Sequence, residues 1–124
     1  MRMNQMPMKT VVVAGLGYVG LPLAMRAAEA GYRVTGYDVD PDRVKLLAAG
    51  ESYVEDVPAS QLAGALESGA FRASCEPRVC AGFDVAVITV PTPLRDGQPD
   101  LAYVEAAART LARYLRPGAT VIVE

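Results

Sequence analysis

Histidine is absent from this sequence of 124 residues, and cysteine occurs only twice. The absence of histidine excludes Ser-His-Asp and Cys-His catalysis and most zinc chemistry from this chain. Cys75 and Cys80 form neither a disulfide framework nor a zinc-binding spacing. We therefore expect each cysteine to be a small buried or half-buried side chain rather than a reactive one.

The sequence also lacks a long apolar run and an excess of basic residues. No apolar segment approaches the roughly 20 residues that a membrane-spanning helix needs. Residues 1–8 have neither the apolar core nor the cleavage site of a signal peptide. The formal net charge is −2 and the basic residues are scattered. We expect no membrane partner, no nucleic-acid partner and a cytoplasmic location.

The length and the composition indicate one compact domain. The apolar fraction is 52% and the mean hydropathy is +0.20, values typical of a chain with a well-buried core. Residues 1–8 show no periodicity, and we expect them to form a disordered tail. A domain over residues 9–124 is small for a complete enzyme with two substrates.

Strand-like and helix-like segments alternate along residues 9–124. Strands are predicted at 9–14, 33–38, 71–74, 84–90 and 119–123, and helices at 18–30, from 41 to a stop at Gly50, at 59–67 and after Asp100, with a helical turn at 76–81. This alternation predicts an α/β fold with a doubly wound, Rossmann-type parallel sheet. The carboxyl ends of the first, second and fourth strands should then meet around one crevice.

Two finer expectations concern the C-terminal third of the chain. The last strand, 119–123, is read as buried, and the proline-rich segment 91–99 as a loop. The last helix is expected to bury one apolar stripe at helical spacing, formed by Leu101, Val104, Ala108, Leu111 and Leu115.

The most informative motif is G-x-G-x-x-G, formed by Gly15, Gly17 and Gly20 between the first strand and the first helix. The first glycine permits a tight turn, the second lets a ligand approach the backbone, and the third lets the helix pack against the strand. The backbone N–H groups of Tyr18 and Val19 should face a pyrophosphate at the positive end of the helix dipole.

Asp38 ends the second strand, 18 residues after Gly20. A carboxylate there accepts hydrogen bonds from the adenosine ribose and repels a 2′-phosphate, which favours NAD over NADP. The alternative is that Asp38 only ends the strand and caps the next turn. Arg43 could reach the adenosine side, the phosphates or the 2′-phosphate of NADP; the alternative is a solvated charge on a helix.

The segment Val90-Pro91-Thr92-Pro93 follows the fourth strand. Its two prolines stiffen the loop, and the Thr92 hydroxyl is left to bind a phosphate or a ribose. The alternative, equally supported by these residues alone, is a rigid turn without a ligand.

Four motifs in order resemble a known family: Gly15–Ala24, Ser52–Asp56, Val90–Leu94 and Pro99–Val104. Together they resemble the NAD-binding domain of the UDP-glucose/GDP-mannose dehydrogenases, which oxidise C6 of a nucleotide sugar from alcohol to acid and reduce two NAD. The Ser52–Asp56 run is more similar to the sequences of the branch that acts on UDP-N-acetylhexosamines than to those of the UDP-glucose branch. The implied substrate is therefore a UDP-N-acetylhexosamine or UDP-glucose.

The resemblance implies that NAD contacts come from two sets of residues. These are Gly15, Leu16, Gly17, Tyr18, Val19 and Gly20 in the glycine loop, and Asp38, Arg43, Val90, Pro91 and Thr92 beside it. It further implies a catalytic cysteine and a sugar-binding half downstream of Glu124, so that this chain is a truncated, inactive part of a homodimeric enzyme. Two alternatives are a β-hydroxyacid-type dehydrogenase domain and a stand-alone nucleotide-sensing module.

Overall fold

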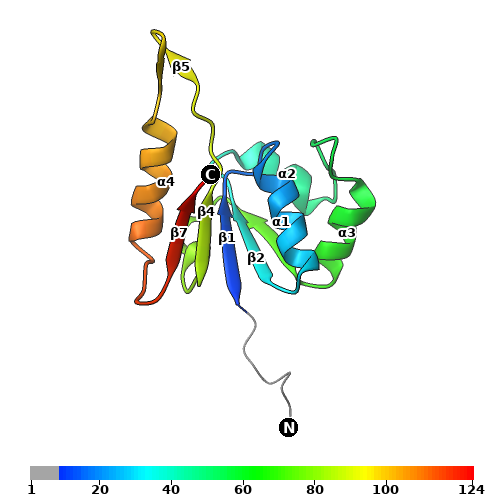
Figure 1. Cartoon of the computed structure of the whole chain (residues 1–124). Helices are drawn as coiled ribbons and strands as arrows, with labels where there is room; N and C mark the ends of the chain where they lie inside the picture. Colours follow the sequence, from blue (N-terminus) through cyan, green and yellow to red (C-terminus); the bar gives the residue numbers. More distant parts are fainter. Residues whose placement is uncertain (1–8) are drawn as a thin grey trace.

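The computed structural model describes residues 9–124, and the tail predicted at residues 1–8 lies outside the described residues. Five parallel strands form one sheet in the order β3-β2-β1-β4-β7 (Figure 1). The strands are β1 (Thr10–Ala14), β2 (Arg33–Tyr37), β3 (Phe71–Ser74), β4 (Val85–Ile88) and β7 (Thr120–Val123). The strand order reverses between β1 and β4, as a doubly wound sheet requires. The predicted α/β, Rossmann-type fold is confirmed.

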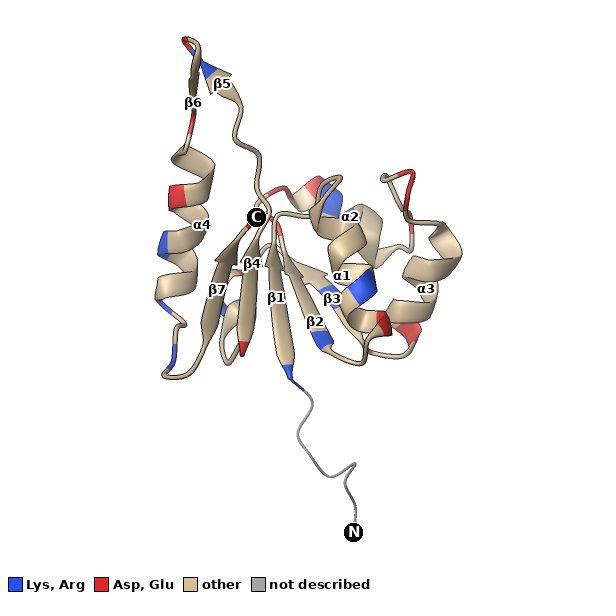
Figure 2. Cartoon of the chain, viewed as in Figure 1, with Lys and Arg blue, Asp and Glu red and all other residues tan. Residues whose placement is uncertain are grey.

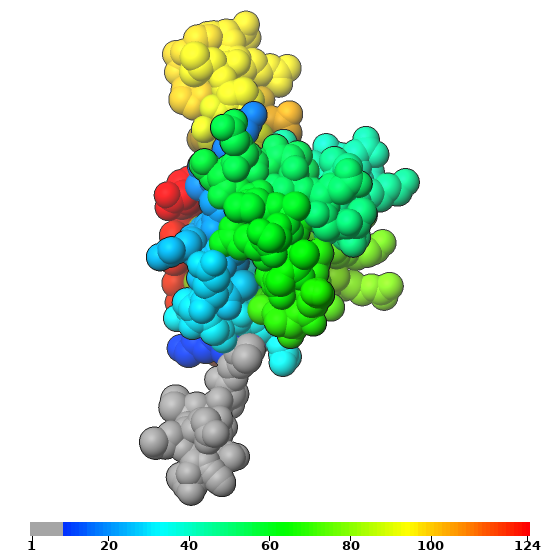
Figure 3. Space-filling view, turned by 90° about the vertical axis from the view of Figure 1, so that its right-hand side faces the viewer, coloured from blue at the N-terminus to red at the C-terminus, as the bar shows by residue number. Residues whose placement is uncertain are grey.

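Helices cover both faces of this sheet. They are α1 (Gly20–Glu29), α2 (Pro41–Ala48), α3 (Ala59–Glu67), the 3-10 helix η2 (Pro77–Cys80) and α4 (Ala102–Ala112). In Figure 1, α1 and α3 lie on one side of the sheet and α4 on the other. Figure 3 shows the face that α1 and α3 cover, with the yellow segment before α4 projecting beyond the body of the domain.

Alternate residues of β1 build two separate cores. Val11 and Val13 pack with α1, α2 and α3, whereas Val12 and Ala14 pack with η2 and α4. Side chains of a strand point alternately to opposite faces, so a strand buried on both faces is a continuous apolar run. The run from residue 10 to residue 14 therefore places β1 at the centre of the sheet.

The helix boundaries follow signals that were read from the sequence. The Asp40 side chain accepts the N–H of Asp42 at 2.9 Å and caps α2. Gly31 and Gly50 follow α1 and α2 with φ of 99° and 79°, a conformation that glycine adopts without strain. Helix α1 begins at Gly20, two residues later than predicted, so the residues before it remain in the turn.

The predicted stripe on the last helix is wrong in part. Ala107 and Leu111 are buried, with Val104 half-buried beside them, whereas Ala108 is exposed. Leu101 and Leu115 are also exposed, because they lie outside the helix and do not follow its period. Positions 106 to 108 are all alanine. The apolar pattern therefore does not show which of two neighbouring helix faces is buried.

The last strand was expected to be buried, and this is also wrong. β7 pairs with β4 alone and forms an edge of the sheet. Val121, Ile122 and Val123 are 41%, 44% and 62% exposed. Within residues 9–124, no further strand pairs with the outer edge of β7.

The proline-rich segment contains a small hairpin that the sequence analysis missed. β5 (Leu94–Arg95) pairs antiparallel with β6 (Gln98–Pro99) across Asp96-Gly97. Both turn residues have positive φ, 53° and 78°, and Asp-Gly is a preferred pair for such two-residue hairpin turns. All four strand residues are exposed.

Charged residues are distributed over the surface of the domain. Figure 2 shows Lys and Arg on α1, α2, α4 and β5 and at the starts of β1 and β2, interspersed with Asp and Glu. In the described part of the chain, no helix has the length and hydropathy needed to cross a membrane.

Candidate functional site

A cavity of about 910 Å³ opens at the carboxyl ends of the central strands, between the glycine loop and α4. It lies where the strand order reverses, the usual ligand position in an open α/β sheet. Nine of the predicted residues line it: Gly15, Gly17, Tyr18, Val19, Asp38, Arg43, Val90, Pro91 and Thr92. The other two, Leu16 and Gly20, are buried beneath the loop.

The three glycines of the loop are required for different reasons. A Cβ at Gly20 would lie 1.8 Å from the carbonyl oxygen of Gly15. Gly15 has a φ of 99°, and its Cβ would lie 2.9 Å from the backbone of Thr89. A Cβ at Gly17 would meet only Arg43 Nη1, at 3.7 Å, which is an ordinary contact. The protein itself therefore leaves open the space above Gly17.

Two N–H groups of the loop are hydrogen-bonded within the protein and three are not. Gly15 N–H donates to the carbonyl oxygen of Tyr37 at 2.8 Å. Leu16 N–H donates to Asp38 Oδ2 at 2.8 Å. Within residues 9–124, the N–H groups of Gly17, Tyr18 and Val19 have no hydrogen-bond acceptor. They precede α1, where unpaired N–H groups and the helix dipole create a positive potential. This arrangement can bind a phosphate.

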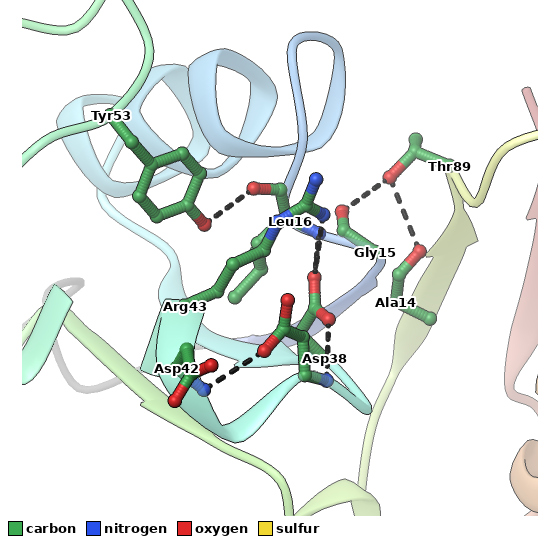
Figure 4. Close-up of polar contacts among 9 residues, drawn as sticks. Ala14, Gly15, Leu16, Asp38, Asp42, Arg43, Tyr53 and Thr89 are labelled. Carbon is green, nitrogen blue, oxygen red and sulfur yellow. Dashed lines mark hydrogen bonds and ion pairs between the residues drawn. The ribbon is translucent and has the colours of Figure 1, made fainter. Parts of the chain in front are cut away.

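Asp38 is held in place by three donors (Figure 4). Its carboxylate accepts Leu16 N–H at 2.8 Å, Asp40 N–H at 2.9 Å and Arg43 Nη1 at 3.3 Å. The bond to Asp40 is the local role that the sequence left open for Asp38. A carboxylate offers about four acceptor positions, so capacity for a ribose hydroxyl remains.

Arg43 packs against the site rather than extending into solvent as a simple helix charge. Its guanidinium pairs with Asp38 and lies 5.6 Å from the centroid of the Tyr53 ring, within cation–π range. The Arg43 side chain stays 41% exposed, so the ion pair itself contributes little to stability. Its position beside Gly17 is what matters for a ligand.

Tyr53 is a site residue that the sequence reasoning did not assign. Its hydroxyl donates to the Leu16 carbonyl oxygen at 2.6 Å, as Figure 4 shows. Burial raises the pKa of Tyr53 to about 12, although nearby Arg43 acts in the opposite direction. The hydroxyl is therefore protonated at neutral pH and remains a donor. The only signal in the sequence was membership of the Ser52–Asp56 run.

Thr89 was likewise missed, because it continues the apolar run of β4. Its Oγ1 donates to the carbonyl oxygens of Gly15, at 2.7 Å, and Ala14, at 3.2 Å. Thr89 therefore joins the glycine loop to the segment that carries Val90, Pro91 and Thr92. That segment faces the cavity.

The wall opposite the glycine loop comes from α4, for which no site residue was predicted. Tyr103, Ala106, Ala107 and Thr110 line this wall, and Tyr37 of β2 lies beside them. Small and aromatic side chains form a largely apolar surface, which suits a flat ring. Burial raises the pKa of Tyr37, so its hydroxyl is neutral here.

The cysteines lie outside the cavity lining. Cys80 is buried as expected, whereas the expectation of burial is wrong for Cys75, which is exposed; both are free. Burial raises the pKa of Cys80 to about 11, which disfavours its thiolate. Among residues 9–124, no group of three Cys, Asp or Glu side chains is arranged to hold a metal ion.

Comparison with known proteins identifies a family. Residues 9–124 match the model of the UDP-glucose/GDP-mannose dehydrogenase family, NAD binding domain. A UDP-N-acetyl-D-mannosamine dehydrogenase from Escherichia coli K12 is 42% identical over 121 residues, which cover 96% of this chain and 28% of that protein. The chain thus spans less than a third of the length of this relative.

Solved structures agree with this match. The UDP-D-ManNAc dehydrogenase of Pyrococcus horikoshii superimposes with a TM-score of 0.89 at 37% identity, over 93% of this chain and 28% of that one. The UDP-glucose dehydrogenase of Pyrobaculum islandicum gives a TM-score of 0.85 at 38% identity, over 99% and 30%. The chain belongs to the UDP-glucose/GDP-mannose dehydrogenase family and corresponds to its NAD-binding domain.

Proposed function

We propose that the cavity above the glycine loop binds NAD, and that the intact protein uses it to oxidise the C6 alcohol of a UDP-sugar to the uronic acid. The observation that carries this proposal is the open space at Gly17, bordered by unpaired N–H groups and by Asp38. Because Gly17 also borders the cavity, its missing side chain leaves room for a ligand to approach the backbone there.

Each part of the dinucleotide has a matching surface in this proposal. The N–H groups of Gly17, Tyr18 and Val19 receive the pyrophosphate. Asp38 accepts a ribose hydroxyl, and its negative charge disfavours the 2′-phosphate of NADP. The adenine lies against the apolar wall of α4. Arg43 and the loop Val90, Pro91 and Thr92 complete the rim.

This chain's residues bind and orient rather than break bonds. When bound, NAD supplies a hydride acceptor, and a fixed geometry lowers the entropic cost of the transfer. The buried thiol of Cys80, with its raised pKa, is poorly suited to act as a nucleophile. We assign the catalytic cysteine and the sugar site to parts of the protein outside this chain.

As the substrate of the intact protein, we propose a UDP-N-acetylhexosamine in preference to UDP-glucose. The Escherichia coli and Pyrococcus horikoshii relatives are named for UDP-N-acetyl-mannosamine, and the Ser52–Asp56 run is similar to that branch. Turnover of the full-length protein with a panel of UDP-, GDP- and TDP-sugars, followed as NADH formation, tests this choice. Three further statements remain predictions: that this chain is part of a longer protein, that the intact protein is a homodimer, and that it is cytoplasmic.

The NAD site is tested by Gly17→Val. The added side chain fills the space above the loop, so calorimetry should show NAD binding weakened at least about tenfold, a cost of ~1.4 kcal/mol. Thermal unfolding should change little, because the Cβ meets nothing closer than 3.7 Å. Gly64→Val is the matched control, since a Cβ at Gly64 meets nothing within 4 Å and Gly64 lies outside the cavity. Full-strength NAD binding by Gly17→Val would reject the site.

A further inference from the structure

Tyr53 lies outside the cavity lining and yet contacts two residues of the site. It belongs to the connection between α2 and α3, 37 positions after Leu16, whose carbonyl oxygen accepts its hydroxyl at 2.6 Å. Its ring lies 5.6 Å from the guanidinium of Arg43. One side chain therefore links the glycine loop to the rim of the cavity (Figure 4).

The connection that carries Tyr53 is anchored in the core. Val54 and Val57 are 4% and 2% exposed and pack in the same cluster as Leu16. Ser52 Oγ donates to the carbonyl oxygen of Val54 at 3.0 Å, which closes a local turn around Tyr53. The hydroxyl is therefore held at Leu16 by packed neighbours.

The contact determines the orientation of one particular peptide unit. Leu16 is fixed at both ends, because its N–H donates to Asp38 and its C=O accepts from Tyr53. The peptide between Leu16 and Gly17 is trans, so its N–H points away from its C=O. Tyr53 on the carbonyl side therefore directs the Gly17 N–H to the opposite side. That N–H has no protein acceptor within residues 9–124.

We propose that Tyr53 is a positioning residue of the dinucleotide site. Its hydroxyl fixes the Leu16–Gly17 peptide so that the Gly17 N–H faces the pyrophosphate, and its ring supports the Arg43 guanidinium at the rim. This inference rests on the proposed function of the cavity. It predicts that the phosphate contacts depend on the Tyr53 hydroxyl, whereas the adenosine contacts do not.

The test is Tyr53→Phe in the full 124-residue chain, with ADP and adenosine as separate probes in NMR titrations. The phenylalanine keeps the ring below Arg43 and removes only the hydroxyl. ADP should bind about threefold to tenfold more weakly, the usual effect of one hydrogen bond. Adenosine has no phosphate and should bind as tightly as it does to the unchanged chain.

A matched control is Tyr32→Phe, because Tyr32 is 40% exposed and precedes β2 at the opposite end of the sheet from the cavity. It should leave both affinities unchanged. Unchanged ADP affinity in Tyr53→Phe would overturn the inference. Equal weakening of ADP and adenosine would also overturn it, because that pattern is expected of general damage to the fold.

A measurement without ligand separates this inference from the proposed function. The amide ¹⁵N and ¹H shifts of Gly17 should move in Tyr53→Phe, while those of Gly64 on α3 stay in place. If Gly17 does not move, Tyr53 does not orient the peptide. If the unchanged chain binds neither NAD nor ADP, the proposed function fails, and the Gly17 shifts still report whether Tyr53 sets the geometry.

Discussion

The two walls of the cavity are built in different ways. On the glycine-loop side, peptide groups of the turn are held by hydrogen bonds from distant residues, among them Gly15 N–H to Tyr37 O and the Tyr53 hydroxyl to Leu16 O. On the α4 side, the lining consists of one helix face, and the hairpin that leads into it is exposed. The glycine-loop wall is thus preorganised by hydrogen bonds between residues that are distant in the sequence.

This difference matches what each wall has to recognise. Phosphates and ribose need donors and acceptors at fixed positions, because a misplaced hydrogen bond loses most of its strength. A flat apolar ring needs only a surface, because dispersion and hydrophobic contacts have no strong direction. Substitutions on the glycine-loop side should therefore have large and specific effects, and those on the α4 side smaller ones.

The largest effect is expected where the glycine-loop wall is most crowded. Gly20→Ala places a Cβ 1.8 Å from the Gly15 carbonyl oxygen, so the loop or α1 must shift. We expect a loss of at least about 3 kcal/mol in the free energy of unfolding, the upper end of overpacking effects. Chemical denaturation measures this loss.

Gly64→Ala is the control for that variant, because a Cβ there meets nothing within 4 Å and lies within α3. It should stabilise the domain by about 0.5–1 kcal/mol. If both variants unfolded at the same denaturant concentration, crowding at Gly20 would not limit the fold.

Asp38→Ala should have an intermediate effect. The variant removes the acceptor for the ribose and leaves the buried Leu16 N–H unpaired, which should weaken NAD binding by about 1–3 kcal/mol. The binding of NADP should weaken less than that of NAD, because the carboxylate no longer repels the 2′-phosphate of NADP. Calorimetric titration with both dinucleotides measures the two changes.

Asp100→Ala is the comparison on the α4 side. Asp100 accepts the N–H of Ala102 at the start of α4 and does not line the cavity. Its removal should cost about 0.5–1 kcal/mol of stability and leave NAD affinity unchanged. Undiminished NAD affinity in Asp38→Ala would remove Asp38 from the ribose site.

The same contrast explains which features were predictable from the sequence. The glycine spacing and the capping residues are local signals, and the run that forms β1 is continuous, so the fold and the position of the crevice followed from them. Asp38 followed as well, because its distance from Gly20 along the chain is set by one helix and one strand.

Other parts of the site depend on packing that no local signal reports. Tyr53 reaches Leu16 across 37 positions, through a loop whose path is set by Val54 and Val57 in the core. The wall of α4 was missed because three consecutive alanines fit either of two stripes. Thr89 was missed because its hydroxyl bonds to backbone atoms of a neighbouring strand.

The smallest expected effect at neutral pH concerns one titratable group on each side of the sheet, the buried Cys80 and the half-buried Tyr53, because both keep their protons at that pH. Cys80 packs with α4 and Tyr53 with the glycine loop. Burial raises the pKa of Cys80 from 9.0 to about 11 and that of Tyr53 from 10.0 to about 12. In the unfolded chain these groups lose their protons at lower pH. The stability is therefore complete below about pH 9 and falls as the pH rises towards 11 and 12.

Cys80 should dominate the first part of this loss. Near pH 10 the stability lost through Cys80 is about 1.4 kcal/mol, the equivalent of one pKa unit. Tyr53, whose pKa is 10.0 in the unfolded chain, is then half deprotonated when unfolded and adds a smaller loss. Urea denaturation at pH 7 and pH 10 should show this difference in the unchanged chain and in Cys75→Ala, whose cysteine is exposed. Cys80→Ala should lower the stability at both pH values but remove most of the difference between them. If the difference persists in Cys80→Ala, the alkaline sensitivity arises from other groups whose pKa values are raised by burial, such as Tyr53 and Tyr37, and not from Cys80.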